Sequence, residues 1–152
     1  MGDRTTVELT VMKSHFPQVK ALLDDFYYSY TTENESFVTT IFYNVNYGNL
    51  MVLPFLIVNG IAYNSYWEKG DEYTSGTEYG RFLEDGTAIV KTIYDNEMDM
   101  PMNKLLEVID DYEALKAAIR KREEELIVLP FDNQEAWGKI YLTKKLIGPS
   151  HT

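Results

Sequence analysis

The stretch YGRFLEDGTAIVKTIY, residues 79–94, decides the fold class. Residues 79–83 and 88–94 are rich in aromatic and β-branched side chains, which favour strands. The pair Asp85-Gly86 between them is a preferred sequence for a tight hairpin turn. The sequence therefore predicts two antiparallel strands joined by a short turn, and we expect an antiparallel sheet to be the framework of the chain.

Two further strands are predicted on the N-terminal side of this hairpin. Apolar and polar side chains alternate over residues 6–12, which is the period of a half-buried strand. Residues 37–47 are rich in β-branched and aromatic side chains, and the turn sequence at residues 46–49 ends them. We expect Val7, Leu9 and Val11 to face the core and Glu8 to face outward.

The next segments are predicted from turn signals and composition. Residues 50–67 supply one or two more strands around the turn pair Asn59-Gly60. Residues 27–36 and residues 68–76 are polar and lack sustained periodicity, so we expect both to be loops.

Helical spacing is found in two segments. Residues 16–26 follow Ser14, which can cap a helix, and Pro17 suits a first helical turn. Residues 102–125 place apolar side chains on one stripe. Asp110 and Glu113 have the spacing of a capping box, so one long helix and two shorter helices both remain open.

After these helices, residues 126–129 are predicted to form a short buried strand and residues 137–147 a final edge strand. The order of elements predicts a single α+β domain over residues 1–152, with residues 148–152 as a flexible tail. We expect a mostly antiparallel sheet of about five to seven strands, with two or three helices packed on one of its faces.

Composition excludes several kinds of chemistry. The chain has no Cys, which excludes disulfides, thiol nucleophiles and Cys-ligated metals. It has only two His, and no serine stands in a nucleophile motif. We therefore expect no cofactor, and the composition argues against most classes of enzyme. Asp95, Glu97 and Asp99 could hold a divalent cation, although such a run before a helix is more often a solvated turn.

The N-terminus has no signal-peptide pattern, and the longest apolar run, residues 50–58, is too short to span a bilayer. The expected location is the cytoplasm.

The charge of the chain points to a partner. Formal net charge is −10, and residues 66–99 hold nine carboxylates against three basic side chains. Such a field attracts basic proteins and repels nucleic acids and anionic membranes. We predict an acidic binding protein that occludes a basic site on another protein, such as a nucleic-acid enzyme or a toxin. Nuclease immunity proteins and phage or plasmid inhibitors that imitate DNA use the same logic, and the comparison rests on charge and size only.

The expected binding surface is a turn-rich segment in which aromatic side chains and carboxylates are interleaved. Aromatic side chains are enriched at binding hot spots, and carboxylates would supply the charge. The candidate residues are Tyr66, Trp67, Glu68, Asp71, Glu72, Tyr73, Glu78, Tyr79, Glu84 and Asp85.

Two other functions remain open. The chain could be a small-molecule-binding or hydrolytic domain with a pocket between helices and sheet, using Tyr hydroxyls and one or two carboxylates. Glu8, Glu78 and Glu84 are the sources of such a carboxylate, and the outward position expected for Glu8 argues against it. The chain could instead be a homo-oligomeric assembly protein that pairs through the edge strand predicted at residues 137–147.

Overall fold

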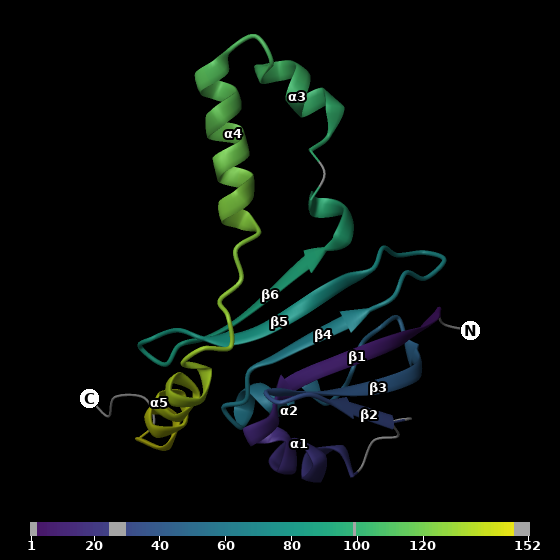
Figure 1. Cartoon of the computed structure of the whole chain (residues 1–152), viewed down its shortest axis with the longest axis vertical. Helices are drawn as coiled ribbons and strands as arrows, with labels where there is room; N and C mark the ends of the chain where they lie inside the picture. The colour runs from purple at the N-terminus through teal and green to yellow at the C-terminus, as the bar shows by residue number, and fades with distance from the viewer. Residues whose placement is uncertain (1–2, 25–29, 99, 148–152) are drawn as a thin grey trace.

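A six-stranded antiparallel sheet in the order β2-β3-β1-β4-β5-β6 is the centre of the molecule (Figure 1). The structure is a computed structural model, and it describes residues 3–24, 30–98 and 100–147. The strands are β1 (Arg4–Met12), β2 (Tyr30–Glu33), β3 (Phe37–Asn46), β4 (Tyr63–Trp67), β5 (Gly76–Phe82) and β6 (Ala88–Tyr94).

Helices follow the first, third and sixth strands in the described part of the chain. They are α1 (Phe16–Leu23), α2 (Leu53–Val58), α3 (Met102–Val108), α4 (Tyr112–Glu125) and α5 (Gln134–Ile147), with 3₁₀ turns η1 (Lys13–His15) and η2 (Asp95–Met98). The predicted α+β class with a mostly antiparallel sheet is therefore confirmed. None of the helices in the described residues is both long and apolar enough for a membrane span.

The core lies between one face of the sheet and helices α1 and α2. Val7, Leu9 and Val11 of β1 are at most 1% exposed, and Glu8 faces outward as its alternation predicts. Val19 of α1 and Leu56 of α2 are completely buried against this face. Full burial of one such side chain stabilises the folded state by about 1.5–3 kcal/mol. β1 lies in the interior of the sheet, where it pairs with both β3 and β4.

The predicted hairpin at residues 79–94 is present as β5 and β6. The amide of Gly86 donates to the Leu83 carbonyl at 2.8 Å, and Gly86 has φ +87°. This left-handed conformation favours glycine, which explains the Asp-Gly pair.

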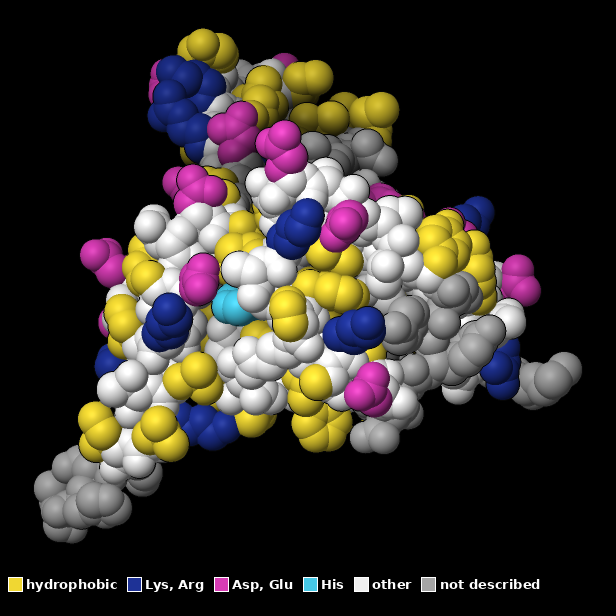
Figure 2. All heavy atoms as spheres, turned by 60° about the horizontal axis from the view of Figure 1, so that its bottom comes forward, with side chains coloured by type: hydrophobic (Ala, Val, Ile, Leu, Met, Phe, Trp, Pro, Cys, Tyr) yellow, Lys and Arg dark blue, Asp and Glu magenta, His cyan; other side chains and the backbone are white. Residues whose placement is uncertain are grey.

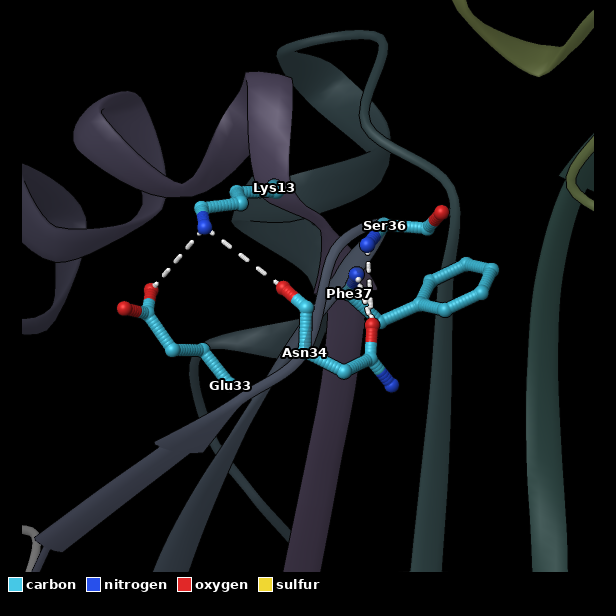
Figure 3. Close-up of polar contacts among 5 residues, drawn as sticks. All are labelled: Lys13, Glu33, Asn34, Ser36 and Phe37. Atoms are coloured by element: carbon cyan, nitrogen blue, oxygen red, sulfur yellow. Dashed lines mark hydrogen bonds and ion pairs between the residues drawn. The ribbon is translucent and has the colours of Figure 1, made fainter.

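Residues 27–36 were predicted to be a loop, and β2 shows that this is wrong for Tyr30–Glu33. β2 pairs along β3, and its four residues are all exposed, so no apolar alternation marks it in the sequence. Figure 3 shows how the following turn is held. Asn34 Oδ1 accepts from the amides of Ser36 and Phe37, while Lys13 Nζ lies 3.7 Å from Glu33 Oε2.

The strand predicted at the start of residues 50–67 is wrong, because Leu53–Val58 form helix α2. A short apolar run fits a buried strand or a buried helix equally well by periodicity. Pro54 stands in the first turn, and Gly60 has φ +71° just after the helix. Asn59-Gly60 therefore ends a helix instead of turning a hairpin.

Helix α5 replaces the edge strand predicted at residues 137–147. Gly138 on α5 lies against Gly60, so close that a Cβ on Gly138 would be 2.2 Å from the Gly60 carbonyl oxygen. The Gln134 side chain accepts from the Phe82 amide at 2.7 Å and donates to the Phe82 carbonyl at 3.0 Å. The ring of Tyr141 packs on that of Phe82. These contacts with distant segments stabilise the helix, and strand-like alternation within the segment did not reveal them.

Residues 126–129 are not a strand of the sheet as predicted, because Leu126 ends helix α4 and residues 127–129 have no regular secondary structure. Side chains bind this segment instead. Arg81 Nε donates to the Leu129 carbonyl at 2.7 Å, and Lys91 Nζ donates to the Ile127 carbonyl at 2.7 Å. The Arg81 guanidinium lies 4.1 Å from the centre of the Phe131 ring. Burial lowers the pKa of Arg81 to about 10.

Helices α3 and α4 form a pair that projects away from the sheet (Figure 1). Residues 102–125 form two helices, which is one of the two alternatives that the sequence left open, and the cap of the second helix is Asp111 and not Asp110. Asp111 Oδ1 accepts from the Ala114 amide at 3.1 Å. Neither helix has a buried residue, so this pair is not packed on a sheet face as the sequence predicted.

Candidate functional site

A pocket of about 710 Å³ lies between α2, the chain leading into it, and strands β4, β5 and β6. The wall on the helix side is formed by residues 47–50, Leu53, Pro54, Ile57 and Val58. The sheet side and the far end are formed by Tyr63, Ser65, Trp67, Tyr73, Glu78, Val90, Thr92 and Tyr94.

Alternation along the strands brings the polar groups of the pocket together. Ser65 lies between Tyr63 and Trp67 on one face of β4. Antiparallel pairing places Glu78 of β5 opposite Ser65, and Thr92 of β6 opposite Glu78. Three neighbouring strands therefore each contribute a polar side chain at the same level of the sheet.

Two glycines leave room for aromatic rings on either side of Glu78. A Cβ on Gly80 would lie 2.3 Å from Cε1 of Tyr63, and a Cβ on Gly76 would lie 2.7 Å from Cζ2 of Trp67. Real side chains do not approach so closely, so the rings lie over β5 only because both positions lack a side chain. The Glu78 side chain stands between these two positions on the same face of β5.

A hydrogen bond joins the two polar groups at the centre of the pocket. The Tyr63 hydroxyl donates to Glu78 Oε2. Tyr63 is 1% exposed, and its burial together with this hydrogen bond raises the pKa of its hydroxyl far above the usual range. Tyr63 therefore stays a donor at neutral pH and orients the Glu78 carboxyl.

Ser65 supplies a second polar group. Its side chain is buried, and Oγ has no hydrogen-bond partner among the described residues. A buried hydroxyl without a partner costs free energy, which a ligand able to pair with it would recover. Ser65 is the direct cross-strand partner of Glu78, so this hydroxyl lies on the same face of the sheet as the Glu78 carboxyl.

The rest of the pocket is largely aromatic. Trp67 and Tyr94 meet edge to face with their ring centres 5.8 Å apart, and Trp67 Nε1 donates to the Thr74 carbonyl at 2.9 Å. Tyr47 and Tyr73 lie 6.2 Å apart at the end of the pocket. The indole is therefore held in place by its own hydrogen bond while its ring lines the pocket.

Glu78 is the one ionisable acid or base other than Tyr among the residues that line the pocket. Hydrolysis by the two-carboxylate mechanism would need a second carboxylate about 5–9.5 Å away, and the lining supplies none. No group of three potential metal ligands occurs among residues 3–24, 30–98 and 100–147. The arrangement is suited to binding, with hydrogen bonds and one negative charge for orientation.

The structure divides the candidate binding residues into four places. Trp67, Tyr73 and Glu78 line the pocket. Tyr66 and Tyr79 alternate with them and lie on the opposite face of the sheet. The remaining five are exposed, with Glu68, Asp71 and Glu72 between β4 and β5, and Glu84 and Asp85 in the turn at the far end of β5.

The acidic side chains therefore do not share one surface. On the face that Figure 2 presents, the carboxylates are interspersed with Lys and Arg side chains and form no continuous band. Asp95, one of the three candidate cation ligands, accepts a hydrogen bond from Ser75 Oγ at 2.5 Å. Asp99 and the side chain of Glu97 lie outside the described residues.

The candidate binding residues did not include four residues that shape the pocket, namely Tyr63, Ser65, Gly76 and Gly80. One signal was available. The run GTEYG places a carboxylate midway between two glycines at alternate positions of a strand, so all three share a face. Gly inside a strand often marks a close approach by another group.

The chain matches no protein-family model, and the search found no matching curated protein or solved structure.

Proposed function

We propose that this protein is a small-molecule-binding domain whose ligand occupies the pocket between α2 and strands β4–β6. The observation that carries the proposal is the Glu78 carboxyl, oriented by the Tyr63 hydroxyl and facing the unpartnered Ser65 hydroxyl inside an otherwise largely apolar pocket.

Size and lining support this proposal. Ligand pockets measure about 300–1,000 Å³ and combine apolar walls with a few placed polar groups. This pocket, at about 710 Å³, falls within that range. Its polar groups come from regular strands, which hold side chains more rigidly than loops do.

The proposal is tested with a library of small molecules of mixed charge. Trp67 lines the pocket, so Trp137→Phe leaves a protein in which fluorescence reports on Trp67 alone. Thr92→Trp places a large ring in the pocket from an exposed position on β6. We expect ligands to change the Trp67 emission and raise the thermal midpoint, and Thr92→Trp to abolish the thermal shift.

Ile93→Trp is the matched control, because Ile93 lies next in β6 on the opposite face of the sheet. Its thermal shifts should equal those of the parent protein. The proposal fails if no compound shifts the midpoint, or if Thr92→Trp binds every compound as well as Ile93→Trp does.

Occlusion of a basic site on another protein is a second proposal. Glu68, Asp71 and Glu72 favour it, because these exposed carboxylates lie in the same loop as the aromatic Tyr73. Capture from a lysate at low and high salt would test it. Replacing these three acids by their amides should release the partner, whereas the same change at residues 123–125 of α4 should not.

A further inference from the structure

We infer that the pocket selects a small organic cation, an amine or a quaternary ammonium that carries an apolar body. This inference rests on the proposed function and goes beyond it by naming the class of ligand. It follows from three properties of the lining, namely its charge, its aromatic rings and its unpaired polar groups.

The charge of the lining is negative and has no counterion within it. Glu78 contributes a carboxylate, and the lining includes no Lys, Arg or His. Arg81 is near in sequence, but it alternates to the other face of β5, where it donates to the Leu129 carbonyl and to Asn64 Oδ1. A ligand cation could therefore supply the opposite charge that the pocket lacks.

Hydrogen bonding leaves part of Glu78 available. Oε2 accepts from the Tyr63 hydroxyl, while Oε1 has no partner among the residues that the structure describes. A neutral apolar ligand would remove water from this oxygen without replacing its hydrogen bonds, which is unfavourable for a charged group. An ammonium group placed beside Oε1 would compensate for that loss.

Aromatic rings provide the second attraction. Five of the sixteen lining residues are aromatic, namely Tyr47, Tyr63, Trp67, Tyr73 and Tyr94. The negative faces of such rings attract cations, and the recognition of quaternary ammonium groups by aromatic cages uses this interaction. The tilted Tyr47–Tyr73 pair and the edge-to-face Trp67–Tyr94 pair present ring surfaces in different directions.

The apolar part of the lining accounts for the body of the ligand. Leu53, Ile57 and Val58 of α2 form one wall, and Val90 of β6 stands across from them on the sheet side. A cationic group at Glu78 would leave a volume bounded by these side chains for alkyl or aryl carbon. An anionic ligand is disfavoured, because the pocket carries a carboxylate and the whole chain a net charge of −10.

The test compares pairs of compounds that differ in charge and hardly in shape. Choline is paired with 3,3-dimethylbutan-1-ol, in which carbon replaces the ammonium nitrogen, and phenethylammonium is paired with 2-phenylethanol. Dissociation constants are measured by Trp67 fluorescence in Trp137→Phe at low salt. We expect at least one cation to bind about tenfold or more tightly than its neutral partner.

The two pairs of compounds distinguish the two kinds of cation. Preference confined to choline indicates a quaternary ammonium ligand, and preference confined to phenethylammonium indicates a protonated amine. Glu78→Gln keeps the shape of the side chain and should remove most of the preference. Glu84→Gln makes the same change of charge in the exposed β5–β6 turn and should retain it.

The comparison in Trp137→Phe needs no further variant, so it remains decisive if Glu78→Gln does not fold. Neutral partners that bind as tightly as both cations would overturn the inference. A preference that persists in Glu78→Gln would do the same. If neutral or anionic library compounds occupy the pocket and both cations do not, the inference fails while the binding function stands. If nothing binds, both fail.

Discussion

The hydrogen bond from Tyr63 to Glu78 is the most consequential residue-level feature of the pocket. The two residues are separated by 15 positions in the chain, and they meet because β4 and β5 pair in one register. A shift of that register by one residue would turn Glu78 to the opposite face. The chemistry of the pocket therefore depends on strand pairing as much as on residue type.

Tyr63 should make the stability of the protein depend on pH above about 10. Its pKa is raised in the folded state by burial and by the Glu78 hydrogen bond, so the unfolded chain loses the proton first as pH rises. The stabilisation is complete below the unfolded pKa and decreases above it, with a slope of up to about 1.4 kcal/mol per pH unit. Tyr63→Phe lacks this contribution.

Urea unfolding from about pH 8 to about pH 11 measures these slopes. We expect the free energy of unfolding to fall more steeply for the parent protein than for Tyr63→Phe. Tyr112→Phe is the control, because Tyr112 is 69% exposed, and it should follow the parent protein. Equal slopes for the parent protein and Tyr63→Phe would contradict the prediction.

Among the elements, α5 owes its position to a close approach between backbones. Gly138 faces Gly60 at the end of α2, and Lys145 Nζ donates to the Val58 carbonyl at 3.2 Å. Lys144 Nζ donates to the Asp85 carbonyl in the β5–β6 turn. Helix α5 thus contacts two turns that lie far apart in the sequence, one after α2 and one between β5 and β6.

Gly138→Ala should destabilise the protein, although Ala is about 1 kcal/mol more favourable than Gly inside a helix. The new Cβ would lie 2.2 Å from the Gly60 carbonyl oxygen, so the backbones must separate. We expect a net loss of about 1–3 kcal/mol in urea unfolding. Thr143→Ala, at an exposed position of α5, should be neutral or stabilising. A gain in stability for Gly138→Ala would show that the contact is not tight.

The start of α4 offers a second test at the level of elements. Asp111 accepts from the Ala114 amide, whereas the capping-box spacing in the sequence pointed to Asp110. Asp111→Ala should therefore lower the stability of α4 by about 1 kcal/mol, or about fivefold in amide protection. Asp110→Ala is the matched control and should have little effect. Hydrogen exchange followed by NMR measures both, and the opposite order would support the cap at Asp110.

The whole molecule combines a buried sheet core with a projecting helical pair. The core-facing side chains of β1 are almost inaccessible to solvent, whereas α3 and α4, which project from the sheet (Figure 1), have no buried residue. Met102 is 70% exposed and Leu106 61%. Since packing supplies most helical stability in proteins, α3 and α4 have less to hold them than α1 or α2.

We expect the α3–α4 pair to open without unfolding of the sheet. Native-state hydrogen exchange at increasing urea should show amides of α4 exchanging with an opening free energy well below that of β1. Amides of β1, β3 and β4 should exchange together, at the free energy of global unfolding. Equal opening free energies for α4 and β1 would mean that the pair belongs to the cooperative core.

The sequence determined the parts of the fold whose signals are local. β1 followed from alternation and the β5–β6 hairpin from the Asp-Gly pair. The break before α4 was one of two alternatives that the spacing of capping residues left open. The net charge of −10 was also a property of sequence alone, and the prediction that it serves to occlude a partner stays untested. The interleaving of aromatic and acidic side chains singled out ten candidate binding residues, and three of them, Trp67, Tyr73 and Glu78, line the pocket.

Tertiary structure decided the remainder, because those segments respond to neighbours that are distant in the chain. β2 is a strand because β3 offers backbone groups to pair with, and α5 is a helix whose Gly138 fits against Gly60. The pocket depends in the same way on strand register, which places Glu78 beside Tyr63 and Ser65. Local periodicity reports which face of a strand a side chain occupies, and only the packing of strands determines what that face meets.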